Sequence, residues 1–360
     1  MIEFDFERLR ALGLTPALAA AATTTDPGGH TTTLHLMRLT EVHRESVRVH
    51  DGVQQHGARA APRLARELDD AQTALAVGDW VLAAFDDSRA VTVHALVPRL
   101  SHIARRDADG RRHPVASNID TALLVMGLDD DFSPRRLERY LALAHSSGVL
   151  PVVVLTKADV VAPASVAERM ARLRSRVSAT LDVFAVNATE PAAAMALAPY
   201  AAVGQTLVLL GSSGAGKSTL TNTLLGTTTQ DTGAVREHDS RGKHTTTTRS
   251  LFCLPGGACV IDTPGLRALR PDVDEATLSA SYADIDALAA HCRFRDCGHH
   301  DEPGCAVREG IDADRLKNFH KLLREARRDT QSVLERQRQV AVWKARTKAS
   351  RARQKDRAGG

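Results

Sequence analysis

Hydrophobic and polar residues follow different patterns in successive parts of the chain. Residues 4–20 have helical spacing and an alanine-rich end, which predicts one short N-terminal helix. Between residues 34 and 105, short β-like runs such as TLHLMRL and VGDWVLAAF are separated by Gly, Asp and Ser. This spacing suits a small OB-like β-barrel. Trp80 is expected in its core rather than on a stacking surface.

From residue 109 onward, buried strands alternate with amphipathic helices. The apolar runs IDTALLVMGL, LPVVVLTKAD and TLVLLG are each followed by a helical stretch, and LFCLPGGACVIDTPG has the pattern of two paired strands. Such alternation predicts an α/β fold with a mostly parallel, doubly wound sheet. Beyond Pro271 the pattern becomes helical around a group of cysteines and histidines.

These patterns divide the chain into five segments. We expect a helical extension, an OB-like barrel, an α/β domain, a helical Cys/His domain and a basic tail, at residues 1–33, 34–108, 109–275, 276–330 and 331–360 respectively. No apolar run reaches the ~18 residues of a membrane span, and the start MIEFDFERLR has no export signal. A membrane is therefore not an expected partner.

Positive charge is concentrated near the C-terminal end. Residues 315–360 contain 15 Lys or Arg and four Asp or Glu, a charge of +11, so residues 1–314 carry −7 of the total of +4. This segregation favours docking on a polyanion, with RNA the first candidate, although a solvated helix explains it equally well. Five cysteines are too few for a disulfide scaffold, and Cys253 and Cys259, in apolar strands, are expected in the core.

The run GSSGAGKST, residues 211–219, fits the phosphate-loop pattern G-x-x-x-x-G-K-[ST]. Glycines let backbone N–H groups turn toward phosphates, and the following helix points its positive end at them. Lys217 would reach the β- and γ-phosphates, and the Ser218 hydroxyl would ligate Mg²⁺. The expected nucleotide-binding residues of this loop are Gly211, Ser212, Ser213, Gly214, Ala215, Gly216, Lys217, Ser218 and Thr219.

The tetrapeptide TKAD ends an apolar strand, as a guanine-reading loop does in GTP-binding proteins. The Asp159 carboxylate can accept hydrogen bonds from guanine N1–H and the 2-amino group, whereas adenine would leave it unpaired. The downstream sequence VNAT is expected to form a second base-contacting loop. The expected base-contacting residues are Thr156, Lys157, Asp159, Asn187 and Ala188.

Two further motifs lie downstream of the phosphate loop. DTPG supplies Asp262, expected to order Mg²⁺, and Gly265, whose amide would sense the γ-phosphate. HTTTT lies where a Mg²⁺-ligating switch threonine belongs, and we favour Thr246 with Thr247 as the alternative. Because the base-reading motifs precede the phosphate loop, the sequence predicts a circularly permuted P-loop GTPase core.

Cys292, Cys297, His299 and Cys305 form the pattern C-x4-C-x-H-x5-C. Three thiolates and one imidazole on a short stretch suit a closed, structural Zn²⁺ site. His300 is an adjacent alternative to His299. Zinc would hold together a small lobe that is poor in apolar residues.

The order of these elements, with RGKHTTTT, DTPGL and CRFRDCGHHDEPGCAV, resembles the ribosome small-subunit-dependent GTPase A family. The resemblance covers about residues 34–330 and implies an OB barrel, a permuted GTPase domain and a zinc-binding C-terminal domain. It implies a GTPase that acts in late maturation of the small ribosomal subunit and is stimulated by it. Thr156 stands where the family has a base-reading Asn.

Leu266 follows DTPG where Ras-like proteins have a glutamine, and its side chain cannot orient an attacking water. We therefore expect low intrinsic hydrolysis and a site that a partner completes. His244 is the candidate to position the water, by its place in the switch loop and by the family resemblance. The alternative is that its imidazole packs or contacts RNA.

The sequence thus predicts a cytoplasmic, monomeric GTPase that binds GTP/GDP with Mg²⁺, the small ribosomal subunit and its rRNA. Two other functions remain open. One is an RNA-binding module that uses GTP as a non-hydrolysed structural ligand. The other is a metabolic P-loop kinase, which has no use for TKAD or for the permuted order.

Overall fold

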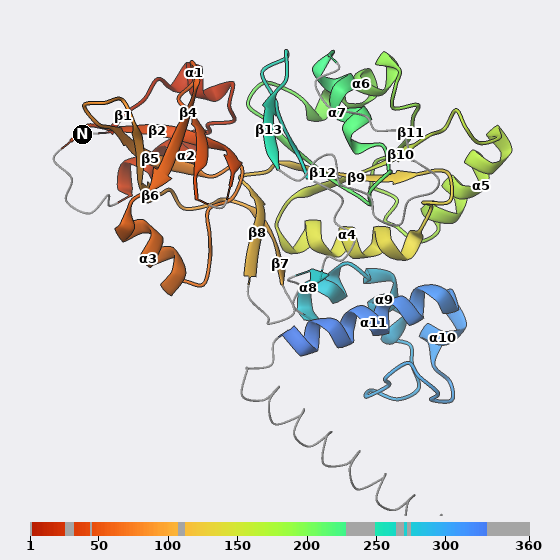
Figure 1. The fold of residues 1–360 in the computed structure, drawn as a ribbon. Helices are drawn as coiled ribbons and strands as arrows, with labels where there is room; N and C mark the ends of the chain where they lie inside the picture. Colours follow the sequence, from red (N-terminus) through yellow and green to blue (C-terminus); the bar gives the residue numbers. More distant parts are fainter. Residues whose placement is uncertain are drawn as a thin grey trace, which may run out of the picture. The chain divides into compact units, whose positions relative to one another are not determined.

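A computed structural model describes residues 2–25, 32–43, 45–106, 112–227, 249–263, 270–271 and 275–329. They belong to two compact units, residues 1–272 and 273–360, which are described separately (Figure 1). Within the described ranges no helix is long and apolar enough to cross a membrane.

The N-terminal segment forms a strand and two helices, so the expectation of one helix over residues 4–20 was wrong. Strand β1 (Ile2–Glu3) pairs in parallel with the first barrel strand, and helices α1 (Phe6–Arg10) and α2 (Pro16–Thr24) follow. Between the helices Gly13 has φ +88°, a conformation that L-residues avoid. This turn ends the first helix, and the proline at the start of α2 begins the second.

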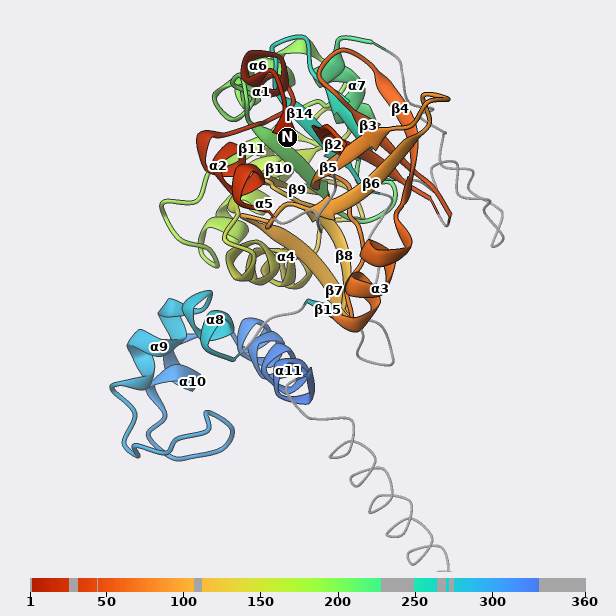
Figure 2. The same cartoon turned by 90° about the vertical axis from the view of Figure 1, so that its left-hand side faces the viewer.

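Five strands close into the barrel that the sequence predicted (Figure 2). They are β2 (Leu34–Val42), β3 (Val47–His50), β4 (Gln55–Ala60), β5 (Trp80–Phe85) and β6 (Val91–Leu96). Their order is β2-β3-β4-β6-β5, and β5 returns to pair with β2. Helix α3 (Pro62–Asp70) precedes β5, and β4 pairs with β6 in parallel. This connectivity is that of an OB barrel, and alternate residues such as Met37, Val49 and Val81 fill it.

The α/β part is a sheet in the order β11-β10-β9-β12-β14-β13. Its strands are β9 (Thr121–Gly127), β10 (Leu150–Thr156), β11 (Val183–Ala185), β12 (Thr206–Leu210), β14 (Cys259–Asp262) and the antiparallel β13 (Ser250–Cys253). Its helices are α4 (Pro134–Ser146), α5 (Pro163–Arg174), α6 (Pro191–Leu197), the 3₁₀ turn η1 (Ala198–Tyr200) and α7 (Lys217–Leu225). Helices α4 and α5 cover one face, and α6 and α7 cover the other (Figure 1). The doubly wound sheet is confirmed.

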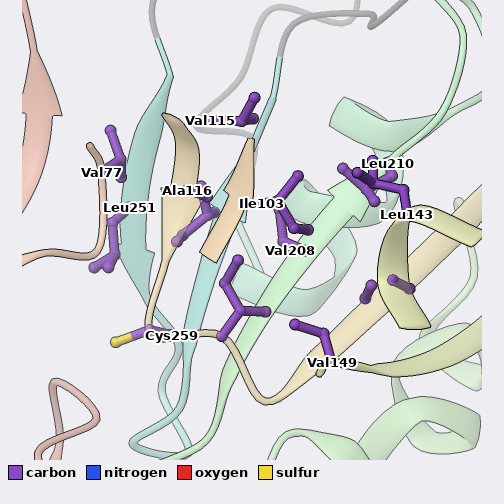
Figure 3. Close-up of a cluster of buried hydrophobic side chains, with 14 of the residues drawn as sticks. Val77, Ile103, Val115, Ala116, Leu143, Val149, Val208, Leu210, Leu251 and Cys259 are labelled. Atoms are coloured by element: carbon purple, nitrogen blue, oxygen red, sulfur yellow. The ribbon is translucent and has the colours of Figure 1, made fainter. Parts of the chain in front are cut away.

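Two apolar layers bury both faces of this sheet. Val153 and Val208 belong to the layer under α4 and α5, whereas Val152 and Leu207 belong to the layer under α6 and α7. Figure 3 shows part of the first layer, including Val208 of β12 and Ile103. Burial on both faces explains why these strands are continuous apolar runs in the sequence.

The barrel and the α/β sheet are joined without a free linker. Strands β7 (His102–Arg106), β8 (Arg112–Ser117) and β15 (Arg270–Pro271) form a small sheet that the sequence did not predict. The boundary expected between residues 108 and 109 falls between β7 and β8. Strand β13 also pairs with β2, at Ser250 and Glu41, which makes one continuous sheet from barrel and core.

A buried arginine on β2 connects the N-terminal segment to this joint. Arg38 is fully buried, and its guanidinium donates hydrogen bonds to Leu12 O, to Thr206 Oγ1 at 2.9 Å and to Asn118 O at 3.0 Å. It also stacks over Trp80, which is fully buried, as expected of a core residue. Burial lowers the pKa of Arg38, but its three guanidinium nitrogens all donate hydrogen bonds, Nε to Gly78 O at 3.4 Å.

The second unit is helical, as the sequence predicted. Its helices are α8 (Glu275–Ala280), α9 (Ala283–Ala289), α10 (Ala306–Gly310) and α11 (Ala313–Asp329). Leu278, Ile285, Val307 and Phe319 form a small buried core, so the helices have more apolar packing than expected. The basic tail at residues 331–360 lies outside the described residues.

Candidate functional site

Three expected motifs meet at the carboxyl edge of the parallel sheet. Strand β10 ends in Thr156, β12 leads into Gly211 and β14 ends in Asp262. Strand β9 lies between β10 and β12, and β14 lies on the other side of β12. Ligands of open α/β sheets bind at this edge. The permuted chain order therefore still brings the base-reading and phosphate-binding motifs together.

The base-reading loop and the phosphate loop are in direct contact. Thr156 is fully buried, and its hydroxyl donates a hydrogen bond to Ala215 O at 2.7 Å. Gly216, at φ +87°, passes so close that an added Cβ would lie 3.2 Å from Thr156 Oγ1. The threonine that replaces asparagine thus still anchors one loop to the other.

The phosphate loop holds its lysine close to the backbone. Lys217 is buried, and Nζ donates to Ser212 O at 2.7 Å and to Gly211 O at 3.2 Å. At Gly211 an added Cβ would lie 2.3 Å from Val125 O, so only glycine fits. Burial lowers the pKa of Lys217, and the nearby Asp262 carboxylate opposes this shift. The Lys217 ammonium is therefore already placed in the loop, where a bound anion would offset the free-energy cost of burying its charge.

Asp262 and Ser218 offer oxygen ligands of the kind that a hard divalent cation binds. The Ser218 hydroxyl donates to Asp262 Oδ2 at 3.3 Å. Asp262 Oδ1 is buried and has no hydrogen-bond partner among the described residues. Burial raises the pKa of Asp262, and the charge of Lys217 opposes that shift. An orphaned carboxylate oxygen beside a hydroxyl fits Mg²⁺.

In TKAD, the Lys157 side chain supports the loop and the Asp159 side chain is exposed. Lys157 has φ +61°, which is uncommon outside glycine, and its Nζ pairs with Asp129 Oδ2 at 2.6 Å. The backbone of Ala158 donates to Val186 O at 3.2 Å. The Asp159 side chain is exposed at the end of this loop. Its carboxylate is free to meet a ligand.

The second expected base loop touches the helix of the phosphate loop. Ala188 is buried, and its carbonyl accepts a hydrogen bond at 2.6 Å from Thr223 of α7. The Asn187 amide donates to Glu190 Oε1 at 2.9 Å, and its oxygen accepts from the backbone of Thr189 at 3.1 Å. The loop is thus preformed at the same edge of the sheet.

Two aspartates that the sequence analysis missed support both loops. Besides the pair between Asp129 and Lys157, Asp131 accepts a hydrogen bond from Ser212 Oγ of the phosphate loop at 2.6 Å. Asp131 also accepts from the backbone of Gly127 at 3.1 Å. A run of aspartates directly after a buried strand was the available signal, because that strand ends at the ligand-binding edge.

The four residues of the Cys/His pattern converge in the second unit. One ligand atom from each of Cys292, Cys297, His299 and Cys305 lies within 4.8 Å of the other three. His299 Nδ1 lies 3.6 Å from Cys292 Sγ and 3.5 Å from Cys305 Sγ. His300 instead stacks on His320, with ring centroids 4.2 Å apart. This cluster could hold a metal ion, and His299 is its histidine.

Four expected residues cannot be placed in this site. His244, Thr246, Thr247 and Gly265 lie outside the described residues. The remaining motifs, in their permuted order, define the class: this is a circularly permuted P-loop GTPase with an OB barrel.

Comparison with known sequences identifies the family. The sequence model of the RsgA GTPase family matches residues 96–271. The "Small ribosomal subunit biogenesis GTPase RsgA" of Xanthomonas oryzae pv. oryzae (strain MAFF 311018) is 48% identical over 293 residues, 79% of each chain. The protein of the same name from Xanthomonas campestris pv. campestris (strain B100) is 49% identical over 282 residues, 78% of this chain and 76% of that one. The chain belongs to the RsgA GTPase family.

Solved structures share the fold. YjeQ from Thermotoga maritima superimposes with a TM-score of 0.58 at 22% identity, covering 81% of this chain and 98% of that one. YloQ, described as a circularly permuted GTPase, has a TM-score of 0.58 at 19% identity, covering 85% of this chain and 99% of that one. At these low sequence identities the structural similarity supports the fold alone.

Proposed function

We propose that this chain is a GTPase that binds the small ribosomal subunit and hydrolyses GTP during late maturation of that subunit. The Xanthomonas relatives are named as GTPases of small ribosomal subunit biogenesis. The observation that carries the proposal is the hydrogen bond from Thr156 to Ala215, because it joins a guanine-reading loop to a phosphate loop. One nucleotide can then contact both loops at once.

Guanine selection would depend on Asp159. Its exposed carboxylate can accept two hydrogen bonds from guanine, while adenine offers an acceptor at N1 and leaves the charge unpaired. Lys157, held by Asp129, would lie along the base and ribose. Asn187 and Ala188 would bound the base on its other side from the second loop.

The phosphates would lie on residues 211–219. Backbone amides of this loop and the N-terminus of α7 would donate to phosphate oxygens, and Lys217 would turn its ammonium to the β- and γ-phosphates. Ser218, Thr246 and Asp262 would hold Mg²⁺, which would supply positive charge at the same oxygens. Asp131 holds Ser212 and thereby the start of the loop.

Hydrolysis is expected to be slow without a partner. Phosphoryl transfer needs a positioned water, and Leu266 cannot hydrogen-bond one. His244 would orient the water and the Gly265 amide would contact the γ-phosphate when the small subunit is bound and completes the site. Because the chain alone lacks a residue after DTPG that positions the water, we expect low intrinsic GTP turnover. Turnover should rise when the small subunit is added.

The Cys/His cluster would hold a structural Zn²⁺. Three thiolates and one imidazole are soft ligands with tetrahedral preference, and four protein donors leave no open position for catalysis. Zinc would stabilise the fold of the loop from Cys292 to Cys305 and would take no part in the reaction at the phosphates.

Contacts with rRNA would be mostly electrostatic. Trp80 is buried, so the barrel lacks this aromatic residue as a stacking platform and would recognise folded RNA by shape and phosphates. The basic tail at residues 331–360 would add salt-sensitive affinity. With this role the protein would act as a monomer in the cytoplasm.

Turnover of GTP and ATP, measured with and without purified small subunits, tests the proposal. We expect selective GTP hydrolysis that increases when subunits are added. Large ribosomal subunits at equal concentration are the control for non-specific RNA. GTP binding with no turnover in either condition would favour an RNA-binding module that keeps GTP as a structural ligand. Preference for ATP would favour a kinase.

A further inference from the structure

Two cysteines outside the nucleotide site lie opposite each other in the β13–β14 hairpin. Cys253 ends β13, Cys259 begins β14, and they are partners in the antiparallel register. The expectation that both are core residues was wrong for Cys253, which is exposed, whereas Cys259 is buried. The pair therefore combines one solvent-facing thiol with one shielded thiol.

Hydrogen bonds around the turn show that this is a close pair. Leu254 N donates to Ala258 O at 2.8 Å, whereas Cys259 N donates away from the hairpin, to Gln205 O at 2.8 Å. Because hydrogen-bonded and non-hydrogen-bonded pairs alternate, Cys253 and Cys259 form a non-hydrogen-bonded pair. Such pairs have Cα atoms about 4.5 Å apart and side chains on one face, within the roughly 4.4–6.8 Å that a disulfide needs.

The two thiols differ in acidity. The neighbouring Cys259 thiol and the charge of Arg38 lower the pKa of Cys253 to about 7, although desolvation opposes them. The neighbouring Cys253 thiol and burial raise the pKa of Cys259 well above its usual value, and the Cys259 thiol donates a hydrogen bond to Ala11 O at 3.6 Å. Cys253 is therefore the more acidic and the more accessible of the two thiols at neutral pH. This is the arrangement of a peroxide-sensitive cysteine with its resolving partner.

We propose that Cys253 and Cys259 form a reversible disulfide with a hydroperoxide as oxidant. The Cys253 thiolate attacks one peroxide oxygen, the O–O bond breaks, and the leaving alkoxide or hydroxide takes up a proton. The Cys259 sulfur then attacks the sulfenic acid, the S–O bond breaks, and hydroxide leaves with the Cys259 proton as water. The two thiols lose two electrons to the peroxide, and a dithiol reductant reverses the reaction.

The disulfide would lie at the turn end of a hairpin whose other end carries Asp262. Ser250 is the partner of Asp262 in the same register. A covalent link between the strands would reduce opening of this hairpin and slow hydrogen exchange of its backbone amides. This proposal does not depend on the nucleotide that the site binds.

Peptide mass mapping of the full-length, metal-loaded protein tests the disulfide. Trypsin releases residues 250–267 as one peptide that contains both cysteines. After hydrogen peroxide at pH 7 and alkylation of free thiols, we expect this peptide unalkylated and two hydrogen atoms lighter. Dithiothreitol should restore both alkylation sites. The proposal fails if both thiols remain alkylatable while Cys292, Cys297 or Cys305 become oxidised.

Matched variants separate two roles of Cys259: lowering the pKa of Cys253 and resolving its sulfenic acid. In Cys259→Ala the pH midpoint of Cys253 alkylation should rise toward the ordinary value of about 8.5, because the neighbouring thiol that lowers the pKa of Cys253 is lost. Cys259→Ser keeps a hydroxyl donor and should keep the midpoint low, and both variants should stop at the sulfenic acid. Cys253→Ser changes only an exposed residue, and in it Cys259 should resist peroxide. Equal midpoints in the alanine variant and the parent, or rapid oxidation of Cys259 in Cys253→Ser, would overturn the proposal.

Discussion

The nucleotide site and the Cys/His loop are positioned by different means. Thr156 and Lys217 are buried at the ends of parallel strands, and apolar layers fix those strands from both faces. The loop from Cys292 to Cys305 has no regular helix or strand, and most of its side chains are exposed, including Phe294. The packed sheet can preform its site without a ligand, whereas we propose that the loop depends on a metal ion, which its four donors could hold.

Loss of the metal should produce the largest effect and should affect only the second unit. Cys297→Ser removes one of four ligands, and structural zinc sites contribute about 10 kcal/mol or more to folding of such segments. We expect loss of bound zinc and fast hydrogen exchange in residues 291–305, with β9 and β12 still protected. Cys253→Ser is the matched control. Equal loss of protection in the sheet would end the distinction between the two regions.

Lys217→Ala perturbs the nucleotide site and should leave the second unit unchanged. Loss of the buried ammonium should reduce subunit-stimulated GTP turnover by about 10²–10³-fold, the usual cost of removing one preorganised donor. Zinc content and exchange in the second unit should not change. Arg172→Ala, an exposed cation of α5 outside the basic segment, is the control. Parental turnover in Lys217→Ala would show that the phosphate loop is not the catalytic site.

A smaller effect is expected at the base-reading end of the site. Asp159→Asn replaces a charged acceptor by a neutral amide, which should weaken GDP binding by about 2 kcal/mol, roughly 30-fold. ADP binding should change little, so selectivity falls with affinity. Glu168→Gln, an exposed carboxylate on α5, is the control. Calorimetric titration with both nucleotides measures this, and an unchanged GDP/ADP ratio would contradict the assignment of Asp159.

The smallest effect is expected where the two loops meet. Thr156→Val keeps the shape but removes the hydroxyl that donates to Ala215 O, which should cost about 1–2 kcal/mol in GDP affinity. Thr156→Ser retains the donor and should recover most of the loss. Equal GDP affinity in the valine and serine variants would mean that the contact does not couple the loops.

Local patterns made much of the fold and site predictable. The parallel strands are continuous apolar runs because they are buried on both faces, and GSSGAGKST requires glycine where Gly211 meets Val125 O. The ends of those strands then fix where the motifs gather.

Contacts between distant segments were not predictable. Arg38 lies between apolar neighbours in LMRLT, and nothing local indicates that its acceptors come from residues 12, 78, 118 and 206. Asp131 likewise acts on a loop that lies 81 residues away in sequence. Such partners depend on the packing of whole elements, which no short pattern encodes.

The central proposal is that Asp159 and Lys217 bind opposite ends of one guanine nucleotide. An experimental structure of the complex with Mg²⁺ and a non-hydrolysable GTP analogue tests it most directly. We expect the guanine N1–H and 2-amino group on the Asp159 carboxylate and the β- and γ-phosphates of the same molecule at Lys217. A base bound away from residues 156–159 while the phosphates occupy residues 211–219 would contradict the proposal.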